Sequence, residues 1–477
     1  MSAGPQLRDG GDPAGTAPAA PPGRWRGLRP LILRIHFYAG LLVGPFLLVA
    51  AVTGLLYTVA PQLERWVHSG ALTAPVSGPE RPLSAQVDAA AATQPGLPVT
   101  EVRPSGGPGA TTRVSFDAGL PESYARTVFV DPYTTRIAAT EDTYAEWLPV
   151  RGVLDNLHRS LLLGDAGRVY TELAASWLAV LAASGLVVAL TRRVRGRRAL
   201  LPQRGGSPRA RLRSWHGAVG IWASIGLFFL AATGLTWSQF AGANVTALRE
   251  ALDWTTPSVS STLPAAGPAA GLPATGAAPL PAADVPAAAQ RVLDAARADG
   301  VGGPVEIVPG DPGEAWRVQQ TVRSWPSQQD AVAVAPGTGE ITDRLAFADW
   351  PVAAKLARWG IDAHMGLLFG VANQIALAAL ASAVIVLVVW GYRMWWLRRP
   401  RLPGSRLPGP DPAGPPGSPE RPSPAAVAVL GAAGLLAGLV LPVLGVSLIA
   451  FLVLDAVLAG RSAARSPAAG GHRTGDG

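Results

Sequence analysis

The chain has no cysteine among its 477 residues. This absence excludes disulfide bonds, thiolate metal sites, iron–sulfur clusters and thioether-attached haem. Any redox or metal chemistry must therefore use histidine, carboxylate or a cofactor that is bound without a covalent link. Histidine is itself scarce, with six residues in the whole chain, so the position of each one is informative.

Charged residues are also few: they make up 15% of the chain, whereas hydrophobic residues make up 49%. The apolar residues gather in four runs that are each long enough to cross a hydrocarbon core of about 30 Å, which takes about 20 helical residues. Two shorter runs flank Pro442 and predict a tight helical hairpin. This pattern predicts a polytopic protein in contact with membrane lipid, with long runs at 37–60, 169–190, 217–240 and 366–392 and short runs at 425–441 and 443–459.

The basic residues are arginines, with the exception of Lys355, and the net charge is +8. Residues 191–213 carry nine arginines and no acid, and further arginines precede the first run and follow the fourth. Short basic segments at alternate ends of apolar runs follow the positive-inside rule. We therefore expect no nucleic-acid partner, cytoplasmic N- and C-termini, and two long loops outside the membrane, at 61–168 and 241–365.

The near absence of lysine, together with abundant alanine, glycine and proline, is typical of a bacterial genome of high GC content. We therefore expect a multi-pass protein of the bacterial cytoplasmic membrane. The first apolar run is longer than the core of a signal peptide and has no convincing cleavage site, so it is expected to remain as an anchor.

The chain contains an internal repeat. His36 precedes Thr53 by 17 residues, and His216 precedes Thr233 by the same interval, and each threonine begins a Thr-Gly-Leu. The second and fourth runs follow the matching segments "HRSLLLG" and "HMGLLFG". Because each unit holds two spans, both units start on the cytoplasmic side, which makes this a parallel repeat.

The two outer loops also match each other. "VFVDPYTTRI" (128–137) and "VAVAPGTGEI" (332–341) each show a short strand, a Pro-x-Thr turn and the start of another strand. An alanine-rich, helix-like stretch lies upstream of each, at 83–93 and 283–298. Each loop is therefore expected to form a small α+β module, and the second contains a Pro/Ala-rich insertion.

Four of the six histidines occupy matching positions in the repeat: His36 with His216 toward the cytoplasmic side, and His158 with His364 toward the outer side. Ionisable residues in or beside membrane spans are functional candidates by default, since the bilayer penalises them. The remaining two histidines have no counterpart in the repeat: His68 and His472.

Small residues follow each inner histidine on one helix face. Gly40 lies four residues after His36, and Gly220 lies four residues after His216, so each glycine is about one turn from its histidine on the same side. Such a face leaves room for a flat cofactor or for another helix packed closely against it. A histidine at the head of the face in both copies favours the cofactor.

Imidazole is a common ligand of haem iron, zinc, copper and nickel. Zinc and copper sites normally gather three or four ligands at one depth, whereas only two repeated histidines lie at each membrane face. Two imidazoles from different helices provide the axial ligands of a six-coordinate b-type haem. We predict two haem b groups, one between His36 and His216 and one between His158 and His364. Candidate partners of the haem propionates are Arg34, Arg213 and Arg159, although the positive-inside rule explains the first two equally well.

These features resemble the PepSY-associated transmembrane family. The resemblance rests on the two histidine–threonine spans, the two "HxxLLxG" segments, the "VDPYTTRI" strand–turn and the basic, tryptophan-rich "GYRMWWLRRPR", and it covers roughly residues 25–400. It implies that the outer modules are PepSY domains, that the four repeated histidines bind haem and, as in some members, that the chain reduces ferric siderophores. Ala335 stands where the first strand–turn has Asp131, so the second module departs from the pattern there.

The expected fold is an all-α polytopic membrane bundle, with four core spans in two parallel repeats and a C-terminal helical hairpin, that carries two extracytoplasmic α+β PepSY-like modules. The predicted segments in chain order are a disordered N-terminus at 1–23, the first span at 24–60, the first module at 61–150, an outer helix and second span at 151–192, a basic loop at 193–213, the third span at 214–240, the second module at 241–349, an outer helix and fourth span at 350–397, a linker at 398–424, the hairpin at 425–460 and a disordered tail at 461–477.

The leading functional hypothesis is electron transfer across the membrane to an external ferric chelate, such as a siderophore, in iron uptake. The chain would then be a haem-dependent ferric-chelate reductase. Its cytoplasmic segments are too short for a flavin or nicotinamide domain, so a quinol or a separate cytoplasmic reductase must supply the electrons. The alternative is a non-enzymatic PepSY membrane protein that binds or regulates an extracytoplasmic peptidase or senses metal. Permeation of metal or siderophore is less favoured, because the spans show no repeated carboxylate or broken helix.

Overall fold

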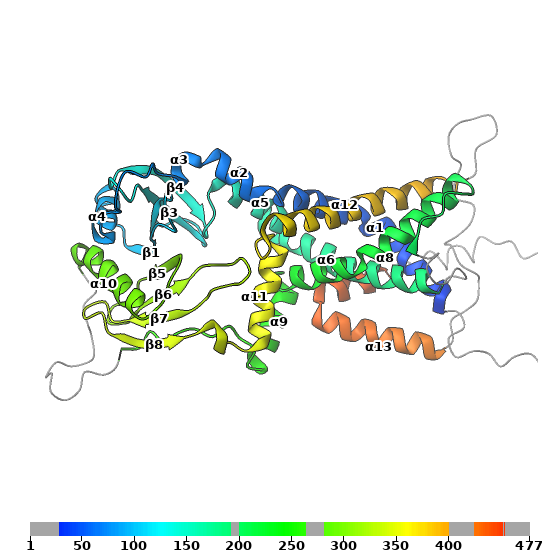
Figure 1. Cartoon of the computed structure of the whole chain (residues 1–477). Coiled ribbons are helices and arrows are strands. Elements are labelled where there is room, and N and C mark those ends of the chain that lie inside the picture. The colour runs from blue at the N-terminus through cyan, green and yellow to red at the C-terminus, as the bar shows by residue number, and fades with distance from the viewer. Residues whose placement is uncertain (1–27, 192–199, 264–280, 400–423, 452, 454–477) are drawn as a thin grey trace, which may run out of the picture.

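The computed structural model describes residues 28–191, 200–263, 281–399, 424–451 and 453. The molecule is elongated, with a bundle of long helices at one end and a β-sheet with two short helices at the other (Figure 1). The segments predicted at 1–23 and 461–477, the end of the hairpin and His472 lie outside the described residues.

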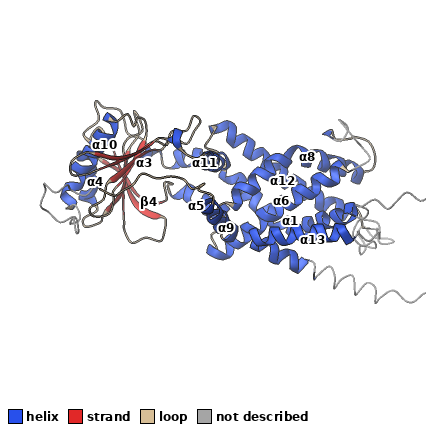
Figure 2. Cartoon of the chain, turned by 90° about the horizontal axis from the view of Figure 1, so that it is seen from below, coloured by secondary structure: helices blue, strands red, loops and turns tan. Residues whose placement is uncertain are grey.

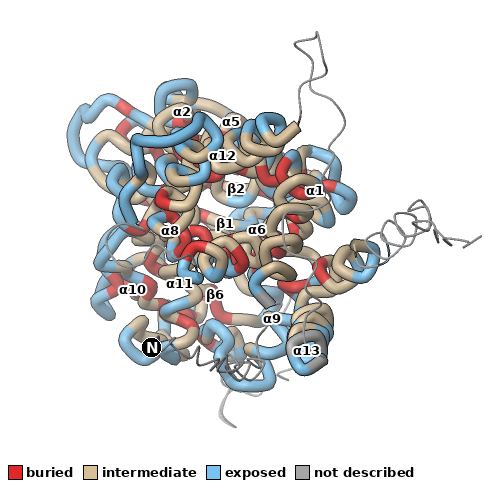
Figure 3. Tube along the Cα trace, turned by 90° about the vertical axis from the view of Figure 1, so that its right-hand side faces the viewer, coloured by how far each residue is buried: buried red, intermediate tan, exposed pale blue. Residues whose placement is uncertain are grey.

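Four helices in the described part of the chain are long and apolar enough to cross a membrane. Only 11 to 33% of the most apolar window of each helix is buried within the protein, which leaves apolar surface for contact with lipid. Figure 3, viewed along the molecule from the bundle end, shows buried segments inside the bundle and paler, exposed ones around it. The four predicted spans and the integral membrane class are thus confirmed, as α1 (Leu28–Tyr57), α6 (Gly164–Leu190), α8 (Pro208–Leu235) and α12 (Gly370–Trp396).

Small residues bring the helices of the bundle together. Gly44 of α1 faces α12, where a Cβ on this glycine would lie 3.1 Å from the ring of Tyr392, and the Tyr392 hydroxyl donates to the carbonyl of Leu41 at 2.5 Å. Gly44, one turn beyond Gly40, is therefore used for close helix packing. Trp177 of α6 is almost fully buried at the centre of the bundle.

Two shorter apolar helices, Ala428–Val440 and Pro442–Phe451, follow the four spans; the first belongs to α13 (Pro424–Val440). Gly438 and Gly445 face each other so closely that a Cβ on either would meet the other backbone at 3.0 Å or less. The second helix is fixed to the bundle by Ser447, which accepts a hydrogen bond from Trp177 Nε1 at 2.9 Å.

The strands form one eight-stranded antiparallel sheet in the order β4-β3-β2-β1-β5-β6-β7-β8. The first four strands and the last four are joined at the centre, where Val102 of β1 pairs with Ile307 of β5. The strands are β1 (Val99–Arg103), β2 (Thr112–Phe116), β3 (Tyr124–Val130), β4 (Ile137–Tyr144), β5 (Val305–Val308), β6 (Trp316–Gln320), β7 (Ala331–Val334) and β8 (Ile341–Leu345).

The helices α4 (Leu83–Thr93) and α10 (Val285–Ala298) lie on the face of the sheet that points away from the bundle (Figure 2). Their alanines and valines, such as Val87 and Val292, are fully buried in one apolar cluster with residues of both halves of the sheet. The sequence predicted two outer modules, and the structure merges them into one sheet with one core. Pairing β1 with β5 removes an exposed edge from each half, which a separate four-stranded module would have to protect.

The strand–turn segments of the two halves have the same backbone geometry despite the difference between Asp131 and Ala335. The N–H of Thr135 donates to the Asp131 carbonyl, and the N–H of Gly339 donates to the Ala335 carbonyl, both at 2.8 Å. In the first turn the Asp131 carboxylate accepts two backbone N–H bonds. In the second, Gly339 takes the left-handed conformation, with φ of 79°, at no steric cost.

Short helices connect the sheet to the bundle. The two that carry outer histidines, α5 (Pro149–Ser160) and α11 (Val352–His364), each lead directly into a membrane-spanning helix. Glu172, within the second predicted span, is almost fully buried, and its carboxylate accepts the N–H groups of Phe240 and Ala241 at the start of another connector. The remaining short elements are α2 (Ala60–Val67), α3 (Ser69–Leu72), α9 (Phe240–Ala251), η1 (Ala282–Asp284) and η2 (Phe347–Asp349).

Candidate functional site

Two pairs of histidines face each other between helices. The inner pair is His36 of α1 and His216 of α8, whose ring centroids lie 6.2 Å apart with the ring planes at 84°. The outer pair is His158 of α5 and His364 of α11, whose centroids lie 6.5 Å apart with the planes at 36°. Each pair joins histidines that are far apart in the chain.

Threonines of the membrane-spanning helices hold the outer pair. Thr53 Oγ1 lies 3.1 Å from Nδ1 of His158, and Thr233 Oγ1 lies 2.6 Å from Nδ1 of His364. Each hydroxyl also donates to a carbonyl one turn earlier on its own helix, at 3.0 Å to Val49 and 2.7 Å to Phe229. The sequence showed these threonines at the same interval from the inner histidines, but their partners are the outer histidines.

These contacts favour one tautomer of the outer histidines, with the proton on Nδ1. A threonine hydroxyl has one proton, and here that proton is given to the helix backbone. The hydroxyl oxygen therefore accepts a hydrogen bond from Nδ1–H of the histidine, which leaves Nε2 unprotonated and able to bind a metal ion. An outer partner that orients a ligating imidazole in this way is the usual companion of a metal-bound histidine.

Glycines give the rings of two histidines close access to neighbouring helices. A Cβ on Gly54 would lie 3.0 Å from Cε1 of His158, and a Cβ on Gly185 would lie 2.9 Å from Cε1 of His36. Ser184, next to Gly185, lies 3.0 Å from Nδ1 of His36 through its hydroxyl. The ring of His36 is thus positioned by α6 in the same way that the ring of His158 is positioned by α1.

His216 has a different environment. Its Nδ1 is buried and has no hydrogen-bond partner within the described ranges. Gly220, one turn further along α8, has no atom of the described residues within 4 Å of a Cβ placed on it, and Gly391 of α12 is equally open. Gly40, the counterpart of Gly220 on α1, lies near Leu181 at an ordinary contact distance of 3.9 Å. Within the described residues, α8 at Gly220 is therefore less closely packed than α1 at Gly40.

The spacing of both pairs fits two axial ligands of one metal ion. A metal–imidazole bond of about 2 Å on each side, with each ring centre about 1 Å behind its nitrogen, puts the two centroids about 6 Å apart. The described residues contain no group of three or more histidine or carboxylate side chains that could hold a metal ion. The donor set is thus two imidazoles at each site, which suits the iron of a b-type haem better than zinc.

The three arginines predicted to pair with haem propionates lie in different settings. Arg213 is exposed near the start of α8, and Arg34 is half-buried on α1, two residues before His36. Arg159 donates to the hydroxyl of Tyr144 on β4 at 2.5 Å, so its contact is with the sheet. Aromatic rings surround His364 instead, with Trp237 at 5.8 Å and Phe229 at 6.5 Å between centroids.

A chain of ion pairs, which the sequence did not reveal, joins the sheet to α11. Arg103 of β1 pairs with Glu146 at 2.8 Å, and Glu146 also pairs with Arg323 of the loop after β6. Arg323 pairs with Asp362 of α11 at 2.7 Å, and Asp362, whose side chain is fully buried, pairs with Arg358 at 3.0 Å. Because Asp362 precedes His364 by two residues, this chain fixes the end of the helix that carries an outer histidine.

The carboxylates of this chain have opposite pKa shifts. Burial acts to raise the pKa of Glu146, but the positive charges of Arg103 and Arg323 outweigh burial and hold it below its usual value. Glu306, which pairs with Arg103 at 2.9 Å, has a raised pKa because burial outweighs its arginine contacts. Glu146 is thus held as the carboxylate that links the first half of the sheet to Arg323 of the second.

The structure therefore defines an integral membrane protein with four spanning helices in the described part of the chain, two histidine pairs between helices and an α+β portion built on one antiparallel sheet. The family model described as the PepSY-associated TM region matches residues 33–398. The chain belongs to this family, as its sequence motifs predicted. Comparison with curated protein sequences gives no match.

Proposed function

We propose that the protein transfers electrons across a bacterial cytoplasmic membrane, through two b-type haems, to an extracytoplasmic ferric chelate. The observation that supports this most directly is the presence of two histidine pairs with centroids 6.2 and 6.5 Å apart. Thr53 and Thr233, the partners of the outer pair, lie 17 residues beyond His36 and His216, which is about 25 Å along a helix. The two sites would therefore lie toward opposite faces of the membrane.

Each part of the chain has a defined task in this proposal. His36 and His216 would hold the inner haem, and His158 and His364 the outer one, and bound haem supplies one-electron redox chemistry. Thr53 keeps Nε2 of His158 free of its proton and available to iron. The apolar bundle keeps water away from both sites, and this exclusion sets the reduction potential together with the axial ligands.

The topology follows from the arginine clusters. We propose that the spans form two parallel repeats, with the N-terminus and the 191–213 loop in the cytoplasm and the sheet outside. Electrons would enter at the inner pair from a quinol or a separate cytoplasmic reductase. One electron delivered from the outer pair reduces Fe(III) to Fe(II), and no covalent bond forms or breaks. Chelators with hard oxygen donors hold Fe(II) more weakly, so reduction releases the iron.

The absorption spectrum of the full chain, purified from haem-replete cells, tests the proposal. We expect a Soret band, visible bands that sharpen on reduction by dithionite, and two haems per chain. His216→Ala and His364→Ala should each remove one haem. His68→Ala is the matched control, because His68 lies between two short helices and belongs to neither pair, so it should leave both haems in place.

Two results would contradict the proposal. A colourless preparation would remove electron transfer through haem and favour the non-enzymatic role of a PepSY protein that binds a peptidase or senses metal. Retention of both haems in His216→Ala would show that the inner site is not built from the pair seen in the structure.

A further inference from the structure

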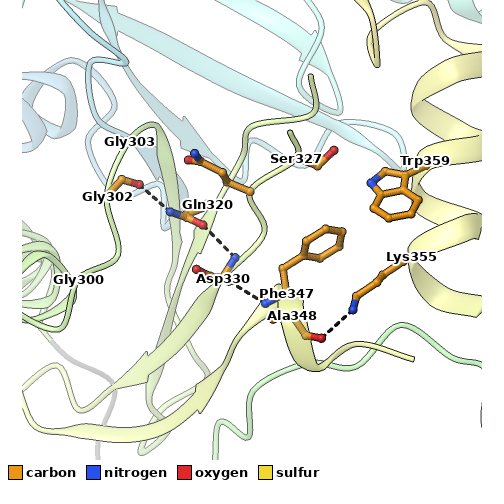
Figure 4. Close-up of a pocket in the computed structure, with 11 residues that line it drawn as sticks. Gly300, Gly302, Gly303, Gln320, Ser327, Asp330, Phe347, Ala348, Lys355 and Trp359 are labelled. Carbon is orange, nitrogen blue, oxygen red and sulfur yellow. Dashed lines mark hydrogen bonds between the residues drawn. The ribbon is translucent and has the colours of Figure 1, made fainter. Parts of the chain in front are cut away.

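A cavity of about 710 Å³ lies between the second half of the sheet and α11 (Figure 4). It is lined by a glycine-rich turn at 300–303, by the end of β6 and the loop that follows it, by η2 and by one side of α11. Its volume falls within the range of about 300–1,000 Å³ that is typical of small-molecule sites. It is separate from the histidine pairs and from the ion-pair chain.

One wall of the cavity is aromatic. Phe347 of η2 and Trp359 of α11 lie with their ring centroids 6.1 Å apart, and the ring of Trp325 lies 5.2 Å from that of Trp359. In Figure 4 Trp359 projects from α11 toward Phe347, with its ring nitrogen on the side of the cavity. Aromatic faces of this kind bind flat or apolar parts of a ligand over a large area.

The cavity also presents unused hydrogen-bond donors. Trp359 Nε1 is buried and has no partner among the described residues, which is costly for a buried N–H unless a ligand accepts from it. Lys355, the only lysine of the chain, uses one of its three protons on the Ala348 carbonyl at 2.7 Å. The carboxylate of Asp330 is itself engaged, since it accepts the N–H of Phe347 at 2.7 Å.

The cavity is close to the outer histidine pair. Trp359 and His364 are five residues apart on α11, about 7.5 Å along the helix axis. The loop that carries Trp325 is tied to the turn after His364, because the Trp325 N–H donates to the Leu368 carbonyl at 2.8 Å. Gly360, next to Trp359, faces Thr233, the partner of His364. A ligand in the cavity would therefore be separated from the outer pair by the width of one helix.

We infer that this cavity binds the ferric chelate, and that the chelate is uncharged or weakly charged with carbonyl or hydroxamate oxygens on its outer surface. The inference rests on the proposed function. The oxygens of such a chelate would accept from Trp359 Nε1 and Lys355, while its apolar parts lie on Phe347 and Trp359. Among the described residues that line the cavity, Lys355 is the one cation and Asp330 the one carboxylate, so a complex with several negative charges, such as a tricatecholate, is disfavoured.

Binding of gallium complexes tests this inference without any redox step, because Ga(III) mimics the charge and size of Fe(III) but is not reduced. The full chain in detergent is dialysed against radioactive gallium bound to a neutral trihydroxamate or to a tricatecholate. We expect the trihydroxamate complex to bind at least about tenfold more tightly. Lys355→Gln and Trp359→Phe should each weaken its binding by about tenfold, since each removes one hydrogen bond to the ligand.

Matched variants serve as controls. Trp66→Phe changes an exposed tryptophan on α2, and Arg136→Gln removes an exposed positive charge from the β3–β4 turn; both should bind the gallium complex like the native chain. Haem content and thermal unfolding of all four variants should match the native values. Lys355→Gln and Trp359→Phe are conservative changes at different parts of the cavity. If one variant does not fold, binding of the gallium complex by the other still tests the inference.

The outcomes separate this inference from the proposed function. Absence of binding of the trihydroxamate complex, tighter binding of the tricatecholate complex, or native affinity in both cavity variants would each overturn the inference, even in a protein that holds two haems. Conversely, a haem-free protein that binds the gallium complex through Lys355 and Trp359 would keep the binding site and refute electron transfer through haem.

Discussion

The hydroxyl oxygen of Thr233 lies 2.6 Å from Nδ1 of His364, although 131 residues separate the two in the chain. The same relationship links Thr53 with His158 at 3.1 Å. A membrane-spanning helix of each half thus orients the histidine at the end of a connecting helix. This contact gives the threonine of the repeated Thr-Gly-Leu a specific role: it favours one tautomer of an outer histidine.

Thr53→Val and Thr233→Val should selectively weaken the proposed outer haem site. Valine has nearly the shape of threonine but cannot accept the Nδ1–H bond, and loss of such an outer partner typically costs about 10–100-fold in metal affinity. Titration of the haem-free protein with haem, followed by the Soret band, measures the change. Thr58→Val is the matched control, because the Thr58 hydroxyl donates to the Leu55 carbonyl of its own helix and lies outside both histidine pairs. Equal effects of Thr53→Val and Thr58→Val would contradict the role assigned to Thr53.

Gly185→Ala should disturb the proposed inner haem site. The new methyl group would lie 2.9 Å from Cε1 of His36, closer than real contacts allow, so the His36 ring must move away from its position opposite His216. We expect loss of about one haem per chain, measured by pigment extraction. Gly431→Ala, on the exposed side of α13 with no atom of the described residues within 4 Å of its Cβ, should keep both haems. A Gly185→Ala protein with two haems and a native spectrum would show that the ring is not held as described.

Gly220→Ala tests whether the face of α8 at Gly220 lies against a cofactor or against another helix of the protein. No atom of the described residues lies within 4 Å of a Cβ at this position, and alanine favours a helix over glycine by about 1 kcal/mol. The haem-free protein should therefore be unchanged or slightly more stable, whereas the haem-loaded protein should show a shifted inner-haem spectrum or lower haem content. Thermal unfolding and the visible spectrum measure the two effects. An unaltered spectrum would remove Gly220 from the cofactor site.

Asp362→Asn should destabilise the junction between the sheet and α11. Asp362 is fully buried between Arg323 and Arg358, and removal of one partner from a buried ion pair costs about 3–5 kcal/mol, since the remaining charges stay buried. Arg344→Gln is the control, because Arg344 and Asp299 pair at the surface, where such pairs contribute about 0–1 kcal/mol. Denaturant unfolding measures both. A similarly small loss of unfolding free energy in the two variants would contradict the stabilising role assigned to Asp362.

Stability should fall in acid through Glu146. Arg103 and Arg323 hold its folded pKa below the ordinary value of 4.5, so its contribution to stability is present above about pH 4.5 and is lost as the pH falls through the folded pKa. Glu306 has a raised folded pKa, so the folded state binds its proton at a higher pH than the unfolded state does. Its contribution to the free energy of unfolding therefore increases as the pH falls. Glu146→Gln should therefore flatten the acid loss of stability, and Glu306→Gln should steepen it, in thermal unfolding measured between about pH 3 and pH 7. The reverse order of the two variants would contradict these assignments.

Several features could be predicted from the sequence because they depend on local order along the chain. The length of the apolar runs determines the four spans, since a helix needs about 20 apolar residues to cross the membrane. The absence of cysteine and the repeated spacing of four histidines limit the metal chemistry, because they depend on composition and spacing alone. The strand–turn segments were also recognisable, because a turn depends on a few neighbouring residues such as Asp131 and Thr135.

The tertiary structure decided the features that depend on residues far apart in the chain. Three contacts each require a particular packing of distant elements: the hydrogen bonds that Thr53 and Thr233 accept from the outer histidines, the ion pair between Arg323 and Asp362, and the pairing of β1 with β5. No periodicity or spacing encodes such contacts, because their partners are chosen by the three-dimensional fit of side chains. The sequence by itself therefore determined which segments are long and apolar enough to span a membrane and which histidines repeat, whereas the packing of the helices and the sheet determined how those residues are oriented.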